Sequence, residues 1–277
     1  MTHLGARELI DLVLDEGSWD SWDTPPDRAG VSPDYAQALA RAAERSGVDE
    51  SVISGEGTLR GRRVAVVAGE FSFLAGSIGR ASAERLIAAV ERATEQRIPL
   101  LAAPASGGTR MQEGTPAFVQ MVRISAAVAR HKSAGLPYLV YLRHPTTGGV
   151  MASWGSLGHI TVAEPGALVG FLGPRVYQAL YGEPFPEGVQ TAENLFAHGI
   201  VDAVVPPEEI GDVLDRALKI LSPGEVEQVA DPGEDDLPEV DAWDAITRSR
   251  RTERPGVRRL LRYAATDVIP LNGTGQG

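Results

Sequence analysis

Two glycine-rich loops contain the residues best suited to do chemistry. One is the Ser-Gly-Gly-Thr-Arg segment at 106–110, which follows a short apolar segment, and the other is the Thr-Thr-Gly-Gly segment at 146–149, which leads into a predicted helix. Glycine has no side chain to cover neighbouring N–H groups, and N–H groups at a helix start stabilise negative charge on an oxygen, such as that of an enolate. One Gly-Gly pair would more often be a tight turn, but two pairs in equivalent places favour candidate oxyanion sites.

Other common catalytic machinery is missing from the sequence. It contains no phosphate loop of the form G-x-x-x-x-G-K-S/T, no H-E-x-x-H zinc motif and no G-x-S-x-G nucleophile motif. The absence of cysteine excludes disulfides, thiolate nucleophiles and zinc sites built on sulfur. The histidines lack metal-ligand spacing, and a structural role is the more common one for scattered residues of this kind. They are His3, His131, His144, His159 and His198.

Charge and hydropathy narrow the class of protein further. The 277 residues include 26 Lys and Arg and 37 Asp and Glu, a net charge of −11, so most of the surface should repel nucleic acid. Charged residues precede any apolar run at the N-terminus, which is not typical of a signal peptide. The longest stretch without Asp, Glu, Lys or Arg, 144–163, is too polar to span a bilayer. We therefore expect a cytoplasmic protein with neither a membrane nor a nucleic-acid partner.

Short apolar strands alternate with glycine loops and amphipathic helices, a pattern typical of an α/β domain. Gly61 separates two strand-like segments and predicts a hairpin, and Thr115 and Pro116 are expected to open a helix as N-cap and first helical residue. The predicted inner face of that helix consists of Phe118, Met121, Val122 and Ser125. The predicted strands span 58–59, 63–68, 98–103, 139–142, 159–163 and 168–170, and the other predicted helices span 7–14, 33–46 and 81–96.

Composition divides the chain into four parts. We predict a helical N-terminal segment over 1–55, a main domain over 56–221, an acidic linker over 222–243 and an Arg-rich C-terminal segment over 244–277. The linker assignment depends on eight acidic residues without a basic one between 225 and 241, a composition typical of a solvated connection.

Five motifs resemble, in sequence and spacing, the β subunit of acetyl-CoA carboxylase carboxyltransferase. The resemblance covers roughly residues 50–210, and the two ends of the chain are most similar to the form in which β and α halves are fused. The motifs are Phe71-Ser-Phe-Leu-Ala-Gly-Ser-Ile-Gly79, Ser106-Gly-Gly-Thr-Arg-Met-Gln-Glu-Gly114, Pro145-Thr-Thr-Gly-Gly-Val150, Ala163-Glu-Pro-Gly-Ala-Leu-Val-Gly-Phe-Leu-Gly-Pro-Arg175 and Pro186-Glu-Gly188 with His198-Gly-Ile-Val-Asp202.

This resemblance implies a crotonase-like α/β fold, a spiral of ββα units that binds acyl-CoA within residues 56–221. It assigns the oxyanion pair to Gly108 and Thr109, whose amides would hold the thioester oxygen as the α-carbon becomes an enolate. It places the loop of Gly148 and Gly149 at the acyl and biotin pocket. The substrate-binding residues it implies are Phe71, Gly76, Ser77, Ile78, Arg110, Gly170, Phe171, Gly173 and Arg175.

The implied reaction is transfer of the carboxyl group from carboxybiotin to acetyl-CoA, which gives malonyl-CoA. The ureido oxygen of biotin can accept the α-proton, so no side-chain base is needed. Carboxybiotin would arrive on a separate carrier, and the implied partners are an α-type carboxyltransferase subunit, biotin carboxyl carrier protein and biotin carboxylase. Without the α-type half the chain should be inactive. Alternatives are a malonate decarboxylase subunit acting on a malonyl thioester, a non-catalytic scaffold of the same type and a crotonase-type hydratase.

The sequence also departs from the family pattern. Many β subunits carry a four-cysteine zinc ribbon, and a chain without cysteine cannot, so we predict no zinc. Position 109 is Thr where the family often has Ala, which leaves the acyl length open. Arg110 and Arg175 could bind phosphate or carboxylate, or could equally be partners in structural ion pairs. The arginines between 248 and 262 could dock on a partner or on CoA phosphates, or could form a solvated helix face.

Overall fold

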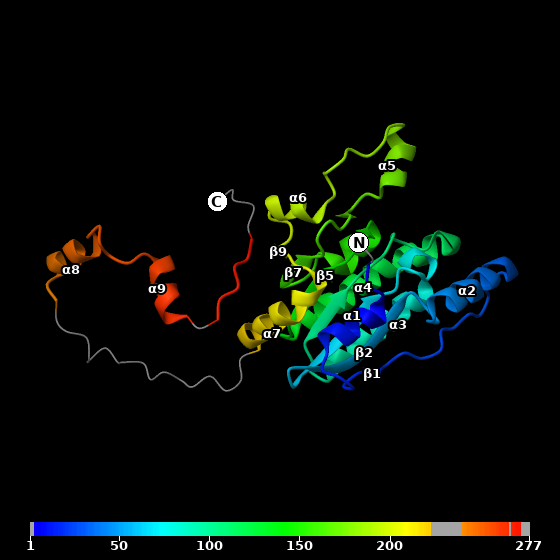
Figure 1. Cartoon of the computed structure of the whole chain (residues 1–277), viewed down its shortest axis with the longest axis horizontal. Coiled ribbons are helices and arrows are strands. Elements are labelled where there is room, and N and C mark those ends of the chain that lie inside the picture. The colour runs from blue at the N-terminus through cyan, green and yellow to red at the C-terminus, as the bar shows by residue number, and fades with distance from the viewer. Residues whose placement is uncertain (1–2, 223–239, 266, 273–277) are drawn as a thin grey trace.

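The computed structural model describes residues 3–222, 240–265 and 267–272, with only the backbone of residues 174 and 175. Strands and helices alternate along most of this length (Figure 1). The strands are β1 (Asp20–Ser21), β2 (Val52–Leu59), β3 (Arg62–Gly69), β4 (Leu100–Ala103), β5 (Tyr138–Leu142), β6 (Thr146–Thr147), β7 (Ile160–Ala163), β8 (Val169–Gly170) and β9 (Ala203–Val204). The α-helices are α1 (Ala6–Val13), α2 (Pro33–Ser46), α3 (Arg80–Glu95), α4 (Thr115–Ser133), α5 (Pro174–Tyr181), α6 (Ala192–Ala197), α7 (Ile210–Leu221), α8 (Ala242–Ser249) and α9 (Val257–Ala264).

A mixed sheet with the strand order β1-β2-β3-β4-β5-β7-β9 forms the centre of the molecule. The first three strands pair antiparallel, and β3, β4, β5, β7 and β9 pair parallel. The predicted hairpin is confirmed, because β2 and β3 pair from Val52–Gly69 to Leu59–Arg62 and Gly61 turns the chain at a φ of 79°. Every residue of β4 and β5 is buried, which explains their uninterrupted apolar sequences.

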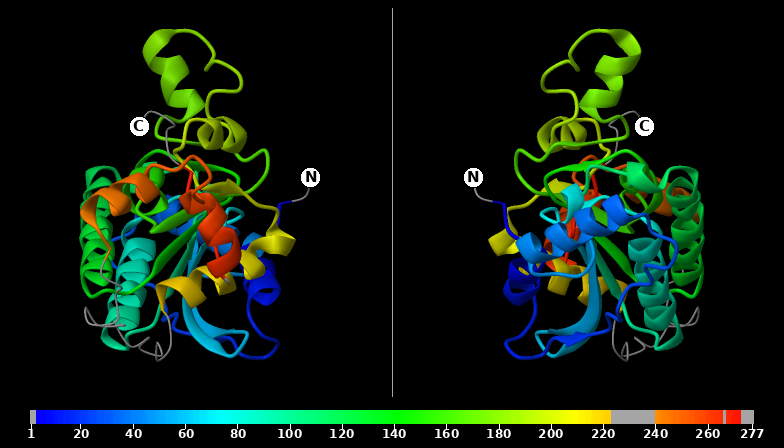
Figure 2. Two further views of the ribbon diagram at one scale, coloured as in Figure 1. Left: turned by 90° about the vertical axis from the view of Figure 1, so that its left-hand side faces the viewer. Right: turned by 90° about the vertical axis from the view of Figure 1, so that its right-hand side faces the viewer.

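Helices cover both faces of this sheet. Figure 2 shows α3 and α4 on one side of it and α1 and α7 on the other. The two faces belong to separate hydrophobic clusters: Val67 and Val140 pack with α3 and α4, whereas Val66 and Tyr141 pack with α1 and α7. Alternate residues of each strand therefore face different helical layers, as the two-residue period of a strand requires.

The predictions for α4 need two corrections. The helix begins at Thr115 after Gly114, and Thr115 makes no side-chain cap, so the predicted N-cap was wrong by one residue. The predicted inner face was half wrong, because Met121 is buried but Phe118 and Val122 are 63% and 70% exposed. The stripe that packs against the sheet follows a 4-3-4 spacing and leaves those two apolar side chains on the flank of the helix. It consists of Ala117, Met121, Ile124 and Val128.

The N-terminal segment contributes to the main body. Helices α1 and α2 confirm the two helices predicted there, but β1 and the start of β2 also lie before residue 56. Leu9 and Ile10 of α1 are buried in the same hydrophobic cluster as Val66 of β3. Most of the acidic linker predicted over 222–243 lies outside the described residues, and helix α8 begins within its last two residues. Helices α8 and α9 contain no buried residue. No helix in the described parts of the chain is long and apolar enough to cross a membrane.

Candidate active site

A second, smaller ladder of parallel bridges brings the predicted site segments together at the ends of the strands. Ile78 bridges Thr109, Ser106 bridges Thr146, and β6 pairs with β8. The bonds along it include Ile78 N–H to the Gly108 carbonyl (3.0 Å) and Thr147 N–H to the Ser106 carbonyl (3.1 Å). Four segments that are far apart in the sequence thus lie side by side: 76–79, 106–110, 146–149 and 169–170.

The loop at 106–110 has the conformation that its glycines allow. Gly108 has a φ of 116°, which a residue with a side chain adopts only under strain. Its N–H donates to Ser106 Oγ at 3.1 Å, so this amide is already engaged. The neighbouring Thr109 N–H has no acceptor among the described residues, and Thr109 is partly exposed. Of the predicted oxyanion pair, Thr109 therefore presents the amide that is free to bind a ligand.

The loop at 146–149 shows the same division of roles. Gly148 N–H donates to the Gly170 carbonyl at 3.0 Å. Gly149 lies at the start of the helical turn that continues as the π-helix Met151–Gly155. Its N–H has no acceptor among the described residues, as is usual at a helix start. A Cβ on Gly149 would lie 3.1 Å from Thr109 Oγ1, so the two free amides belong to adjoining residues. N–H groups on two adjoining residues could both donate to one developing oxyanion.

The segment at 71–79 packs closely on the first loop. Gly76 has a φ of 64°, and a Cβ there would overlap the carbonyl oxygen of Ala105. Gly107 N–H donates to the Ala75 carbonyl at 2.9 Å. Gly76 and Ile78 are buried, whereas Ser77 is partly exposed and Phe71 is 41% exposed. These residues adjoin the loops as the resemblance implies, and their binding of a ligand stays a prediction.

The remaining substrate-binding candidates lie between β8 and α5. Gly170 accepts the Gly148 amide, Phe171 is exposed, and Gly173 is the N-cap of α5. Arg175 lies in the first turn of this helix, and its side chain is outside the described part of the structure. Figures 1 and 2 show α5 projecting from the main body.

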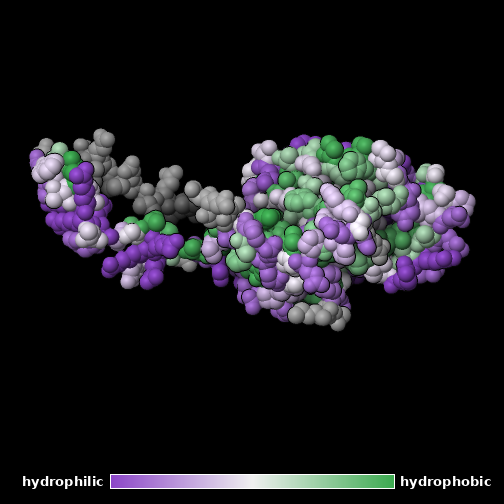
Figure 3. Space-filling view, turned by 90° about the horizontal axis from the view of Figure 1, so that it is seen from above, coloured by the Kyte–Doolittle hydropathy of each residue, from purple (hydrophilic) through white to green (hydrophobic). Residues whose placement is uncertain are grey.

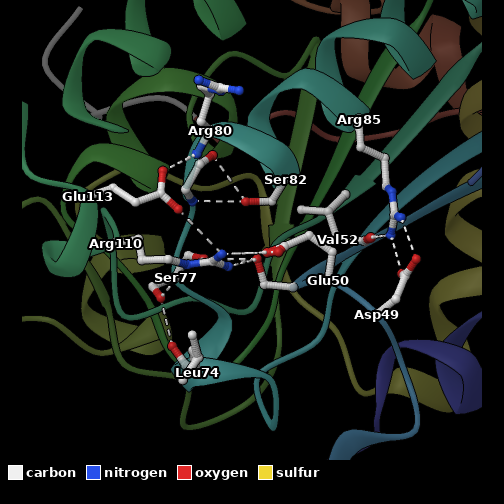
Figure 4. A network of polar contacts seen from close by, with 12 residues as sticks. Asp49, Glu50, Val52, Leu74, Ser77, Arg80, Ser82, Arg85, Arg110 and Glu113 are labelled. Atoms are coloured by element: carbon white, nitrogen blue, oxygen red, sulfur yellow. Dashed lines mark hydrogen bonds and ion pairs between the residues drawn. The ribbon is translucent and has the colours of Figure 1, made fainter. Parts of the chain in front are cut away.

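Arg110 forms a buried ion pair, one of the two roles that the sequence left open. Its side chain is 1% exposed, and its Nη1 atom lies 2.5 Å from Oε1 of the fully buried Glu50 (Figure 4). Burial lowers the pKa of Arg110, but the charge of Glu50 and its hydrogen bonds outweigh this effect and raise the pKa overall. The guanidinium is therefore charged and engaged in a buried ion pair, and its binding of substrate stays a prediction.

The residues around Arg110 were missed by sequence reasoning. Besides Glu50, the network includes Tyr35, whose hydroxyl donates to Glu113 Oε1 at 2.5 Å, and Glu113 also accepts the Arg80 N–H at 2.6 Å. Burial and the Glu113 hydrogen bond raise the pKa of Tyr35 to about 12. The signal that could have found this network is the arginine of a loop otherwise made of small residues, since a buried cation needs an anionic partner.

The histidines near the sheet hold backbone groups. His144 Nδ1 accepts the Leu168 N–H at 3.1 Å, and His159 Nδ1 accepts the Tyr138 N–H at 3.0 Å. Burial lowers the pKa of both rings, which favours the neutral form that can accept. In the described residues, no group of three or more His, Asp or Glu is arranged to hold a metal ion.

Apolar side chains remain exposed at this end of the molecule. Figure 3, which looks onto the end that carries α5 and α6, shows hydrophobic surface among the polar surface. The exposed apolar residues of the η2 turn (Met111–Glu113), α4, the β8–α5 loop and α5 are Met111, Phe118, Val119, Val122, Phe171, Val176, Leu180 and Tyr181. Apolar surface of this kind is typical of a protein interface.

Comparison with known proteins identifies the family that this chain resembles. A family model described as "Carboxyl transferase domain" matches residues 2–274. The probable biotin-dependent acyl-coenzyme A carboxylase beta3 subunit of Mycobacterium tuberculosis is 60% identical over 277 residues, all of this chain and 56% of that protein. The chain thus spans about half the length of this relative. The acetyl-coenzyme A carboxylase carboxyl transferase subunit beta of Desulforudis audaxviator is 43% identical over 224 residues, 80% of this chain and 81% of that protein.

A solved structure supports the fold independently. One chain of a Pseudomonas malonate decarboxylase hetero-tetramer, in complex with malonate, superimposes with a TM-score of 0.64 and 24% identity, over 94% of this chain and 95% of that chain. At this level of identity the similarity establishes the fold alone. It confirms the predicted crotonase-like α/β architecture.

Proposed function

The chain belongs to the carboxyl transferase domain family, and from this premise we propose that it is the β-type subunit of acetyl-CoA carboxylase carboxyltransferase. In this proposal it binds acetyl-CoA and directs transfer of the carboxyl group from carboxybiotin, which gives malonyl-CoA. The observation that carries the proposal is the pairing of the two glycine loops, with the Thr109 and Gly149 amides adjacent and free of acceptors among the described residues.

The backbone performs the part of the reaction that this chain contributes. Removing a proton from the α-carbon of a thioester moves negative charge onto the thioester oxygen, and amides held against that oxygen lower the energy of the enolate. The carboxyl group is supplied by carboxybiotin, whose ureido oxygen accepts the proton. The enolate carbon then forms its new bond to the carboxyl carbon as the N–C bond to biotin breaks. His144 and His159 accept backbone N–H groups, and this mechanism assigns no role to a histidine.

The exposed apolar face supports the need for a partner. We propose that an α-type carboxyltransferase subunit covers α4 and α5 and completes the pocket for biotin. Phe118 and Val122 would be buried in that interface, which explains why they face away from the sheet. Biotin carboxyl carrier protein and biotin carboxylase would complete the assembly.

The experiment is reconstitution with identified partners. The tagged chain is recovered from its native cells, the co-purifying proteins are probed with labelled streptavidin, and the complex is assayed with acetyl-CoA, propionyl-CoA and a longer acyl-CoA. We expect a biotinylated partner, malonyl-CoA as the preferred product, and no transfer by the chain alone. Preference for a longer acyl-CoA would keep the carboxyltransferase proposal and overturn the acetyl-CoA assignment.

The second candidate is a malonate decarboxylase subunit. The observation that favours it is the superposition on the Pseudomonas malonate decarboxylase chain along nearly the full length of both chains. A complex without biotin that carries a phosphopantetheine-type carrier and decarboxylates a malonyl thioester would establish this candidate and contradict the carboxylase proposal.

A further inference from the structure

Arg110 follows Thr109 directly and ties its loop to the neighbouring segment through both backbone and side chain. Its N–H donates to the Ile78 carbonyl at 2.9 Å, and Ile78 N–H donates to the Gly108 carbonyl at 3.0 Å. The peptide groups on either side of Thr109 are thus bonded to one residue of the 71–79 segment. Gly108, at a φ of 116°, gives the loop little rigidity of its own.

The guanidinium of Arg110 fastens the same two segments a second time. Its Nη2 and Nε atoms donate to the Ser77 carbonyl at 2.7 and 3.2 Å, and Nη2 also donates to Ser51 Oγ at 3.0 Å. Glu50 holds the other end, with Oε1 and Oε2 at 2.5 and 3.0 Å from Nη1 (Figure 4). The planar guanidinium fixes the relative direction of these bonds, which the ammonium of a lysine cannot do.

A buried ion pair of this kind is poorly explained by stability alone. Removing two charges from water costs about as much as their attraction returns, and apolar residues of similar volume often serve a core equally well. The distinctive property of this pair is its position, because it orders the loop immediately beside the free Thr109 amide.

We propose that Arg110 and Glu50 are positioning residues that hold the Thr109 N–H in the direction needed to stabilise the enolate. This inference rests on the proposed carboxyl transfer. The pair touches neither substrate nor reacting atoms and acts through the backbone of residues 108–110. A second tie reinforces it, because Glu113 accepts the Arg80 N–H at the start of α3 and the Tyr35 hydroxyl, and that hydroxyl accepts from Arg110 Nη1 at 3.3 Å.

The chain offers a matched control in Arg85. Its side chain is also buried and also pairs with a carboxylate, Asp49, at 2.8 Å. Its other contacts are with the carbonyls of Val52 and Thr24 and with Asp23 Oδ1 at 3.4 Å. Figure 4 shows the Arg85–Asp49 pair as separate from the contacts of Arg110. Among the described contacts it makes none with the 106–110 loop or the 71–79 segment. Arg85→Lys therefore repeats the chemistry of Arg110→Lys without disturbing the loop.

The test compares Arg110→Lys, Glu50→Gln and Arg85→Lys in the complex assembled with the co-purified partners. Because displacement of a reacting group by about 1 Å costs roughly 10²-fold in rate, we expect Arg110→Lys to lower kcat by about that factor, with KM for acetyl-CoA changed less than threefold. Glu50→Gln should lower kcat in the same way, and Arg85→Lys should keep the wild-type kcat. Equal kcat in Arg110→Lys and Arg85→Lys would overturn the inference.

Hydrogen exchange provides a readout that does not depend on activity. Arg110→Lys should speed exchange in peptides that contain the Ile78 and Arg110 amides, and Arg85→Lys should not. If Arg110→Lys fails to fold, Ser51→Ala replaces it. This variant removes one acceptor of the guanidinium and the bond from Ser51 Oγ to the Ser77 carbonyl at 2.9 Å. It should speed the same exchange and lower kcat, and wild-type behaviour in both would overturn the inference. A wild-type complex that transfers no carboxyl group would contradict the proposed function instead, and the exchange data would still test the loop restraint.

Discussion

Substitution of Gly149 by alanine tests whether the two glycine loops form one site. A Cβ at this position would lie 3.1 Å from Thr109 Oγ1 and 3.2 Å from Met121 Cγ, both shorter than an ordinary contact of at least 3.4 Å. Met121 is flexible and can move aside, whereas the β-branched side chain of Thr109 is stiff. The loops must therefore separate by about 0.3 Å at Thr109.

This displacement gives the expected magnitude. If a misplacement of about 1 Å costs roughly 10²-fold, a displacement of about 0.3 Å costs roughly fourfold in kcat, or about 0.8 kcal/mol in activation free energy. Thr109→Ala removes the Oγ1 atom while it keeps the amide, so alone it should leave kcat close to wild type. The double variant Gly149→Ala/Thr109→Ala should recover most of the loss, apart from the part due to Met121.

The assay is steady-state carboxyl transfer by the reconstituted complex at several acetyl-CoA concentrations, with all four members of the double-mutant cycle. The coupling free energy between the two positions should match the loss caused by Gly149→Ala. Wild-type kcat in Gly149→Ala, or a loss that Thr109→Ala does not reverse, would mean that the two loops do not act on one oxyanion.

Two further predictions concern stability. Gly76→Ala should destabilise the fold by more than about 4 kcal/mol, because the added Cβ overlaps the Ala105 carbonyl. Gly61→Ala, at a similar positive φ but in open space, should cost only about 1–2 kcal/mol. Urea unfolding measures both free energies, and equal losses would contradict the close approach at Gly76. Burial lowers the pKa of His131, so the unfolded chain binds its proton more readily and stability should fall as the pH drops below about 6.5. His131→Gln should reduce the pH dependence of the unfolding free energy by at most about 1.4 kcal/mol per pH unit, and a pH profile identical to that of the wild type would refute the assignment.

Local sequence was sufficient for most elements and for the site segments. The strand–loop–helix order, the hairpin at Gly61 and helix α2 were predicted because each is governed by residues adjacent in the chain. The exposure of Phe118 and Val122 on α4 was not predicted, since apolar residues lie on more than one face of this helix and the sequence permits either face to be buried. Phe118 and Met121 are equally apolar, and only the position of the sheet buries Met121.

The sequence by itself determined the family, the absence of cysteine chemistry and the two loops whose backbone amides could stabilise an oxyanion. Tertiary structure decided that the Gly148 amide is engaged, because its acceptor, the Gly170 carbonyl, lies on β8, whereas the Gly108 amide is engaged locally by Ser106 Oγ two residues earlier. It also decided that Arg110 pairs with Glu50, sixty residues away in the chain. Contacts of this kind depend on how strands are brought side by side, and the physical chemistry of the individual residues does not specify that arrangement.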